Sequence, residues 1–250
     1  MACCPPDPNK GIKKMDLSAP LLRFQAELLS DLERIRIANE NRLRQLTRTD
    51  ADKDEETRGF GLPEDHHSVV QLRAIVDGTT ELEKIAEKTL RAELRLHPMY
   101  PWIKEQKGIG DKQGARLLAS VGDPYWHAAE DRPRLVSELW QYAGHGDPLR
   151  SRRKRGQQVQ YSPDAKMRLY LVSLSCMKSG GPWREVYDFR RKATADRIHT
   201  LPCVRCGPSG HPAQPGSPWS AGHQMADALR IAGKEILRAM YVEAKKLHDS

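Results

Sequence analysis

Two long amphipathic stretches constrain the fold of this chain more than any other feature. The first runs from Pro20 to Thr49, and its apolar positions recur at steps of three and four residues, at Leu21, Leu28, Leu32, Ile35 and Leu46. Leu22, Leu29 and Leu43 widen that stripe. The second begins near Val69 and again carries one apolar side. This spacing is typical of a coiled-coil seam. With a charged break between them, the two stretches predict an antiparallel helical hairpin over residues 20–98.

The remaining chain predicts shorter helices and no strands, so the expected fold class is all-α. Pro133 occupies a position that favours the first turn of a helix, and Ser162-Pro163 predicts another helix start. Residues 99–250 are expected to form one compact helical domain, within which residues 199–223 are irregular because they are rich in proline and glycine. Residues 1–19, with three prolines, predict a disordered tail.

The composition favours a cytoplasmic protein, nucleoid-associated if the source is prokaryotic. No apolar run approaches the ~18–20 residues that a membrane helix needs, and the first residues contain no apolar signal core. The chain has five cysteines, two of which are adjacent, and this pattern does not suit a disulfide framework.

The charge distribution points to an anionic partner. The formal net charge is +8, and residues 147–192 alone contain twelve lysines and arginines but only four acidic residues. The whole excess of positive charge therefore lies in one segment. This concentration predicts contact with DNA or structured RNA, and a solvated basic face without a partner is the alternative.

A glycine turn precedes this basic segment. The run Lys107-Gly108-Ile109-Gly110, followed by Lys112, resembles a helix-hairpin-helix motif. Backbone N–H groups at the start of the next helix can bind phosphate, and the two lysines would add charge. Such a contact positions a nucleic-acid backbone without reading its sequence. A plain turn between two helices is the alternative.

Further basic residues complete the predicted nucleic-acid interface: Arg150, Arg152, Arg153, Lys154, Arg155, Lys166 and Arg168. The first five surround Ser151 and would either hold a phosphate or lower the pKa of a nucleophilic serine. A phosphate-binding loop is the favoured interpretation, since no companion base or metal site is visible beside Ser151.

The order of several motifs adds a family resemblance. The segments "WIKEQKGIGDKQGARLLASVGD", "LWQYAGHGDP", "YSPDAKMRLYLVSL" and "HQMADALRIAGKEILRAMYVEAKKLH" follow one another as in the C-terminal transposase domain of the bridge-RNA-guided insertion-sequence transposases. "RIRIANENRLRQL" is similar to the coiled coil of that family. The resemblance implies DNA recombination in transposition, with Ser151 as the candidate nucleophile. The family's N-terminal RuvC-like acidic domain has no counterpart in this sequence.

Three hypotheses of function follow. The leading one is a nucleic-acid-binding protein that forms a homodimer through residues 20–96. The second is an active transposase that uses Ser151 together with an acidic domain supplied by another chain. The third is a helical adaptor whose basic segment binds an acidic protein partner.

A cluster of cysteines and histidines suggests a metal. Cys203, Cys206, His211 and His223 offer four ligands within a loop too poor in apolar residues to order itself. A structural zinc ion would give that loop a core. His199 and His211 are interchangeable at this stage, and a reduced surface cysteine pair is the alternative.

Overall fold

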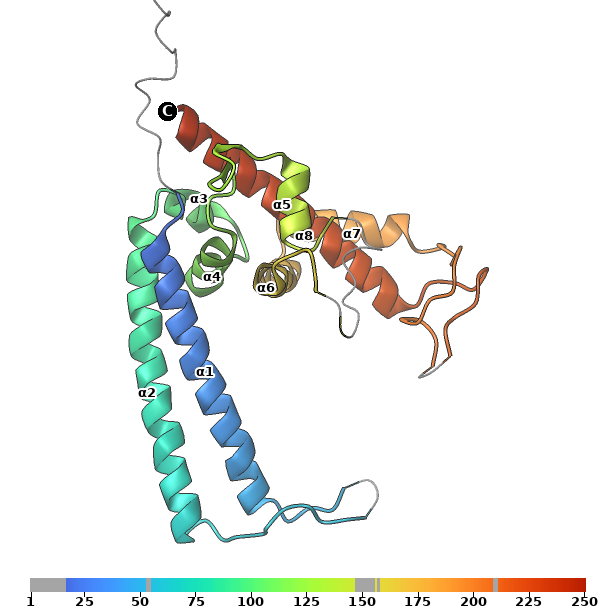
Figure 1. The fold of residues 1–250 in the computed structure, drawn as a ribbon. Coiled ribbons are helices and arrows are strands. Elements are labelled where there is room, and N and C mark those ends of the chain that lie inside the picture. The colour runs from blue at the N-terminus through green and yellow to red at the C-terminus, as the bar shows by residue number, and fades with distance from the viewer. Residues whose placement is uncertain (1–16, 53–54, 147–155, 157, 209–210) are drawn as a thin grey trace, which may run out of the picture. The chain divides into compact units, whose positions relative to one another are not determined.

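Figure 1 shows the computed structural model, which describes residues 17–52, 55–146, 156, 158–208 and 211–250. Over these ranges the chain forms eight α-helices and one pair of two-residue strands, so the predicted all-α class is confirmed. The chain divides into a hairpin unit, Pro20–Leu96, and a second unit that contains residues 17–19 and His97–Ser250. Within the described ranges, no helix combines the length and apolar character needed to cross a bilayer.

The hairpin unit consists of α1 (Pro20–Thr47) and α2 (His67–Leu96), which lie side by side and antiparallel (Figure 1). Leu29 of α1 and Leu90 of α2 are fully buried. Arg36 Nε donates to Glu83 Oε1 at 2.7 Å and so links the two helices. The linking ion pair and the buried leucines together fix how the two helices face each other.

The apolar stripe predicted to form the hairpin seam is buried on one side and exposed on the other. Leu21, Leu28 and Ile35 are 65%, 40% and 50% exposed, whereas Leu22 and Leu29, one position further along, are buried. Consecutive helical residues point about 100° apart, so two neighbouring apolar rows can share one sequence pattern. The inward row therefore follows Leu22 and Leu29, which widen the predicted stripe, whereas Leu21, Leu28 and Ile35 face outward.

The second unit is built around one long helix. Its elements in chain order are α3 (Tyr100–Glu105), α4 (Asp111–Val121), β1 (Trp126–His127), β2 (Arg132–Pro133), α5 (Val136–Tyr142), α6 (Pro163–Ser179), α7 (Pro182–Ala193) and α8 (Ala221–Asp249). Helices α5, α6 and α7 pack against α8, and α4 packs against α6. Leu169 of α6 and Ile236 and Leu237 of α8 are fully buried in this core.

Local sequence signals explain most helix starts, with one exception. The Ser162 hydroxyl accepts a hydrogen bond from the Ala165 N–H at 3.1 Å, and Pro163 begins α6 as predicted. The expectation that Pro133 opens a helix is wrong, because Pro133 pairs with Trp126 between β1 and β2. Helix α5 begins three residues later, where the Glu138 carboxylate accepts the Leu135 N–H at 2.7 Å.

The end of the predicted tail is ordered. Leu17 is 1% exposed, and its carbonyl oxygen lies 3.3 Å from His97 Nε2. A disordered tail as far as residue 19 is therefore wrong at its last residues, and residues 1–16 lie outside the described part. Helix α7 ends at Ala193, and the hydroxyl of the C-cap residue Thr194 donates to the Arg190 carbonyl at 3.0 Å.

Candidate metal centre

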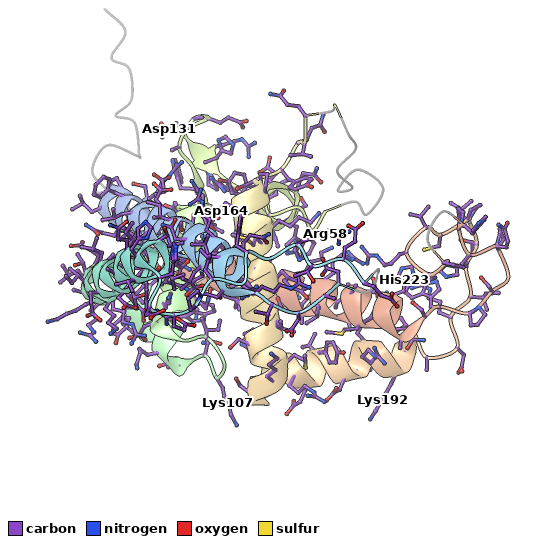
Figure 2. The ribbon with its side chains drawn as sticks, turned by 90° about the horizontal axis from the view of Figure 1, so that it is seen from below. Arg58, Lys107, Asp131, Asp164, Lys192 and His223 are labelled. Carbon is purple, nitrogen blue, oxygen red and sulfur yellow. The ribbon has the colours of Figure 1, made fainter. Side chains whose placement is uncertain are left out.

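Four side chains of the second unit converge on one point. His199, Cys203, Cys206 and His223 each offer one ligand atom, and these four atoms all lie within 4.8 Å of one another. Figure 2 shows His223 where the irregular segment meets the start of α8. Two thiols and two imidazoles in this arrangement form a group that can hold a metal ion.

The backbone of the irregular segment positions the first three ligands. The segment folds back on itself through antiparallel bridges of Ile198 with Pro218 and of Cys203 with Ala213. The two N–H groups of the Cys203–Ala213 pair each donate at 2.9 Å. Immediately after Cys206, a Cβ on Gly207 would lie 1.7 Å from the His211 carbonyl oxygen. Only glycine fits this tight turn, which returns the chain toward Ala213.

The fourth ligand, His223, is held by a helix cap and by an aromatic stack. The Ser220 hydroxyl accepts the His223 N–H at 3.2 Å, and the Trp219 ring lies parallel to the imidazole with centroids 4.0 Å apart. His223 Nδ1 is 3.2 Å from Cys206 Sγ and 3.7 Å from Cys203 Sγ. In tetrahedral zinc sites, ligand sulfur and nitrogen atoms are roughly 3.5 Å apart, given metal bonds of about 2.3 and 2.0 Å.

The electrostatics of the group suit metal binding. Burial, aided by the charge of Arg205, lowers the pKa of His223, so its imidazole is neutral as a ligand must be. Burial by itself would raise the pKa of the Cys206 thiol. Hydrogen bonds with Ser220 and Cys203 and the charge of Arg205 outweigh burial and lower it. The lower pKa favours the thiolate, the form that binds metals.

One buried atom tests the fit independently. His199 is 5% exposed, and its Nε2 atom is buried without a described hydrogen-bond partner. Leaving such a polar atom unsatisfied costs about 1–3 kcal/mol. A metal ion bound in the group would offset that cost, so the residues present fit a metal.

The structure corrects one predicted ligand. His211 is exposed, and its N–H donates to the Pro208 carbonyl at 3.0 Å in the turn that follows the cysteines. His199 takes its place in the group, and it lies between the two antiparallel bridges that fold the segment back on itself. Ligand spacing alone left the two histidines as alternatives.

The glycine turn at residues 107–110 has a packing role that the sequence did not reveal. Gly108 has φ +94°, and a Cβ there would lie 2.7 Å from the Cα of Cys176 on α6. Ile109 is 6% exposed, whereas Lys107 and Gly110 are exposed. Gly108 is therefore required for the close approach of the turn to α6.

The other predicted basic residues have varied surroundings. Lys112 is half-buried in the first turn of α4. The Lys166 ammonium lies 4.3 Å from the Tyr161 ring centroid. Arg168 is 7% exposed and donates to Asp164 at 3.2 Å. Its side chain is therefore part of the interior of the second unit. Ser151 and its five basic neighbours, Arg150, Arg152, Arg153, Lys154 and Arg155, lie outside the described residues.

The chain shows no match to known proteins by three comparisons. No protein-family model matches it, and neither a curated protein nor a solved structure proves similar.

Proposed function

We propose that this chain is a nucleic-acid-binding protein, related to the transposases that its motif order resembles, and that its second unit contacts phosphate groups. The observation that carries this proposal is the segregation of charge. The entire net charge of +8 resides in residues 147–192, and the rest of the chain is balanced. A field of one sign on one segment attracts a polyanion and orients its approach.

The described part of this unit presents exposed cations that support the proposal. Lys107, Lys178 and Lys192 are exposed. Figure 2 shows Lys107 and Lys192 pointing away from the ribbon on the same side. Lys107 Cδ lies 3.2 Å from the position a Cβ would take on Gly181, at the start of α7, and Lys192 lies in the last turn of that helix.

The lysines at the two ends of α7, Lys107 and Lys192, are spaced widely enough for a nucleic-acid contact. Helix α7 has 12 residues and is therefore about 18 Å long. Successive phosphates of one DNA strand are about 3.4 Å apart along the axis, so the two lysines can span several of them. Phe189 of the same helix is 75% exposed and offers an aromatic surface for bases or sugars.

A charge-neutralising variant tests nucleic-acid binding. We expect Arg152→Gln, Arg153→Gln, Arg155→Gln to weaken binding to duplex DNA and to reduce the salt slope by roughly 2.7, at about 0.9 per phosphate contact. The matched control removes three cations from α2 (Lys84→Gln, Lys88→Gln, Arg91→Gln) and should bind as the wild type does. Equal affinity of the two triple variants would contradict the proposal.

Zinc is the metal that the Cys/His group favours, and its role is structural. Two thiolates and two imidazoles complete a tetrahedral shell and leave no open position for a substrate. Metal analysis of purified protein tests this assignment. We expect one zinc per chain in the wild type and in His211→Ala, and loss of zinc in His199→Ala and in Cys203→Ser, Cys206→Ser. Retention of zinc by the double cysteine variant would overturn the ligand assignment.

Homodimerisation is supported by outward-facing apolar rows on the hairpin unit. Heptad spacing relates the exposed residues Leu21, Phe24, Leu28 and Ile35 of α1, and likewise Ile75, Leu82, Ile85 and Leu96 of α2. A heptad seam on each helix suits a bundle with two further helices. A second copy of the hairpin supplies helices of matching length and pattern.

A recombinase activity is the second candidate function, favoured by the motif order and by the position of Ser151 among five basic residues. A Ser151→Ala variant should then bind DNA with unchanged affinity but fail to break or join strands. Strand transfer that survives this substitution would exclude Ser151 as the nucleophile.

A further inference from the structure

The outward apolar row of α2 is an uninterrupted heptad seam. Its positions advance by alternating steps of three and four residues and carry no charge, at Ile75, Gly78, Leu82, Ile85, Thr89, Ala92 and Leu96. Six of these seven residues are exposed, although a seam of this pattern normally packs against another helix. The outward row of α1 has the same spacing, at Leu21, Phe24, Leu28, Asp31, Ile35 and Ala38. Each helix of the hairpin therefore carries a second packing face.

The outward rows of the two helices lie on the same side of the hairpin. In α1, Leu28 immediately precedes the buried Leu29, and in α2, Ile85 immediately precedes the buried Ala86. One residue turns an α-helix by about 100°, so each outward row is rotated in the same sense from the row that faces the other helix. Because α1 and α2 are antiparallel (Figure 1), equal rotations bring both outward rows to one side.

One ion pair fixes which levels of the two helices match. Arg36 Nε lies 2.7 Å from Glu83 Oε1, so these two residues stand at the same level along the hairpin. Steps of equal length in opposite directions along antiparallel helices preserve this match. Ile35 of α1 and Ile85 of α2 therefore lie within about one residue, or roughly 1.5 Å, of the same level on the exposed side.

We propose that a second copy of the chain covers this side through a two-fold axis parallel to the helices, so that α1 of each copy packs on α2 of the other. An axis in this direction leaves every level unchanged. The facing pairs, one residue from α1 and one from α2 of the other copy, are Phe24 with Leu96, Leu28 with Ala92, Asp31 with Thr89, Ile35 with Ile85 and Ala38 with Leu82. This inference rests on the proposed homodimer for its occupant and adds the symmetry and the register of the interface.

The sizes and polarities of the facing residues favour this axis. Each alanine faces a leucine, and Asp31, the one charged residue in this part of the α1 row, faces the hydroxyl-bearing Thr89. A two-fold axis perpendicular to the helices would instead pack α1 on α1. Every register that keeps both Phe24 and Asp31 in such a seam sets Asp31 against a leucine or an isoleucine. Burying a carboxylate against an apolar side chain is unfavourable.

The size of the covered face and the charges beside it also suit a second copy. The α2 seam is about 32 Å long and two helices are about 20 Å wide, so the two copies together would bury roughly 1,200 Å², as specific interfaces do. Glu27 and Arg95 each stand one position before a seam leucine, which places opposite charges beside the seam across the interface. Arg34, which faces Lys88, lies 3.1 Å from Asp31 and so is paired with a carboxylate.

Exchanging the two side chains of one facing pair tests the axis. In the full chain, Leu28→Ala leaves a cavity and Ala92→Leu overfills the seam, so each should raise the dimer Kd about ten-fold or more, measured by sedimentation equilibrium. The double variant Leu28→Ala, Ala92→Leu restores the volume of the layer and should return the Kd to within about three-fold of the wild type. The matched control, Leu28→Ala, Ala38→Leu, makes the same two changes at positions that do not face each other, and should stay as weak as the single variants.

The outcomes separate this inference from the proposed function. Recovery in the control but not in the exchange variant, or equal Kd values for the two, would overturn the parallel axis while the homodimer stands. A wild-type chain that stays monomeric at micromolar concentration would overturn both the homodimer and this inference, whereas nucleic-acid binding is measured separately by its salt dependence. Circular dichroism identifies a variant that has lost its helices, and the second facing pair, Ala38→Leu with Leu82→Ala, then decides the result.

Discussion

At the residue scale, Gly108 and Gly110 are two positions apart but differ in what surrounds them. A side chain on Gly108 would meet the backbone of α6 and would be strained at φ +94°. We expect Gly108→Ala to lower the free energy of unfolding by about 1–3 kcal/mol, measured in urea. No described atom lies within 4 Å of a Cβ on Gly110, so Gly110→Ala should change it by less than about 0.5 kcal/mol.

The two glycine variants also separate the packing role from a phosphate role. If Gly108→Ala lost DNA affinity without losing stability, the turn would serve as a phosphate site after all. The sequence showed both glycines but could not distinguish them, because the partner of Gly108 is Cys176, far along the chain. Contacts between distant residues are not encoded in local spacing.

A second residue-scale prediction concerns Trp219, which stacks on His223 and is itself covered by the Arg197 guanidinium at 4.9 Å. Residues that orient a metal ligand typically contribute 10–100-fold to metal affinity. We expect Trp219→Ala to weaken zinc binding by about that factor in competition with a chelator. Trp219→Phe keeps an aromatic ring over the imidazole and should retain most of the affinity. Identical affinities for the two variants would show that the stack does not position His223.

At the scale of elements, the outward rows of the hairpin predict self-association. Charges placed in an apolar seam must be desolvated on association, so Leu82→Lys, Ile85→Lys should convert a dimer to a monomer. Size-exclusion chromatography with light scattering measures the mass directly. Lys84→Glu, on the same helix but outside the seam and with a side chain 67% exposed, is the control and should remain dimeric. A wild-type protein that is monomeric at micromolar concentration would contradict the prediction.

The hairpin also shows what the apolar periodicity of a sequence can and cannot predict. The apolar pattern predicted two long helices, and α1 begins at the expected Pro20 and ends two residues before the expected Thr49. It included both the inward and the outward row but did not distinguish them, because Leu21 and Leu22, like Leu28 and Leu29, are adjacent apolar pairs. Packing against α2 decides between adjacent rows, and packing is a property of both helices together.

In the irregular segment, the sequence predicted the absence of a helix but not how the backbone folds. Its proline and glycine content correctly predicted the absence of a helix. The cysteine pair indicated a group of side chains that can hold a metal ion. The antiparallel bridges that bring His199 to Cys203 have no signal in the sequence, since Ile198 and Cys203 are not part of an alternating run. The ligand set therefore emerged only from the folded backbone.

At the scale of the whole molecule, the division of the chain into two units matches the distribution of its charge and of its exposed apolar residues. The basic segment and the metal group both belong to the second unit, whereas the hairpin unit carries the outward apolar rows. In the function we propose, the second unit contacts nucleic acid and the hairpin unit self-associates. Fold class was accessible from sequence because helical periodicity is local, but the ligand set of the metal group required the folded backbone.

The central claim is that the second unit binds nucleic acid through phosphate contacts. The most direct test is the affinity of the purified full chain for duplex DNA and for a structured RNA as the salt concentration rises from 50 to 200 mM. With about six phosphate contacts, the affinity should fall roughly 10³-fold over this range. An affinity that stays constant over the same range, or binding to neither nucleic acid at 50 mM salt, would contradict the claim.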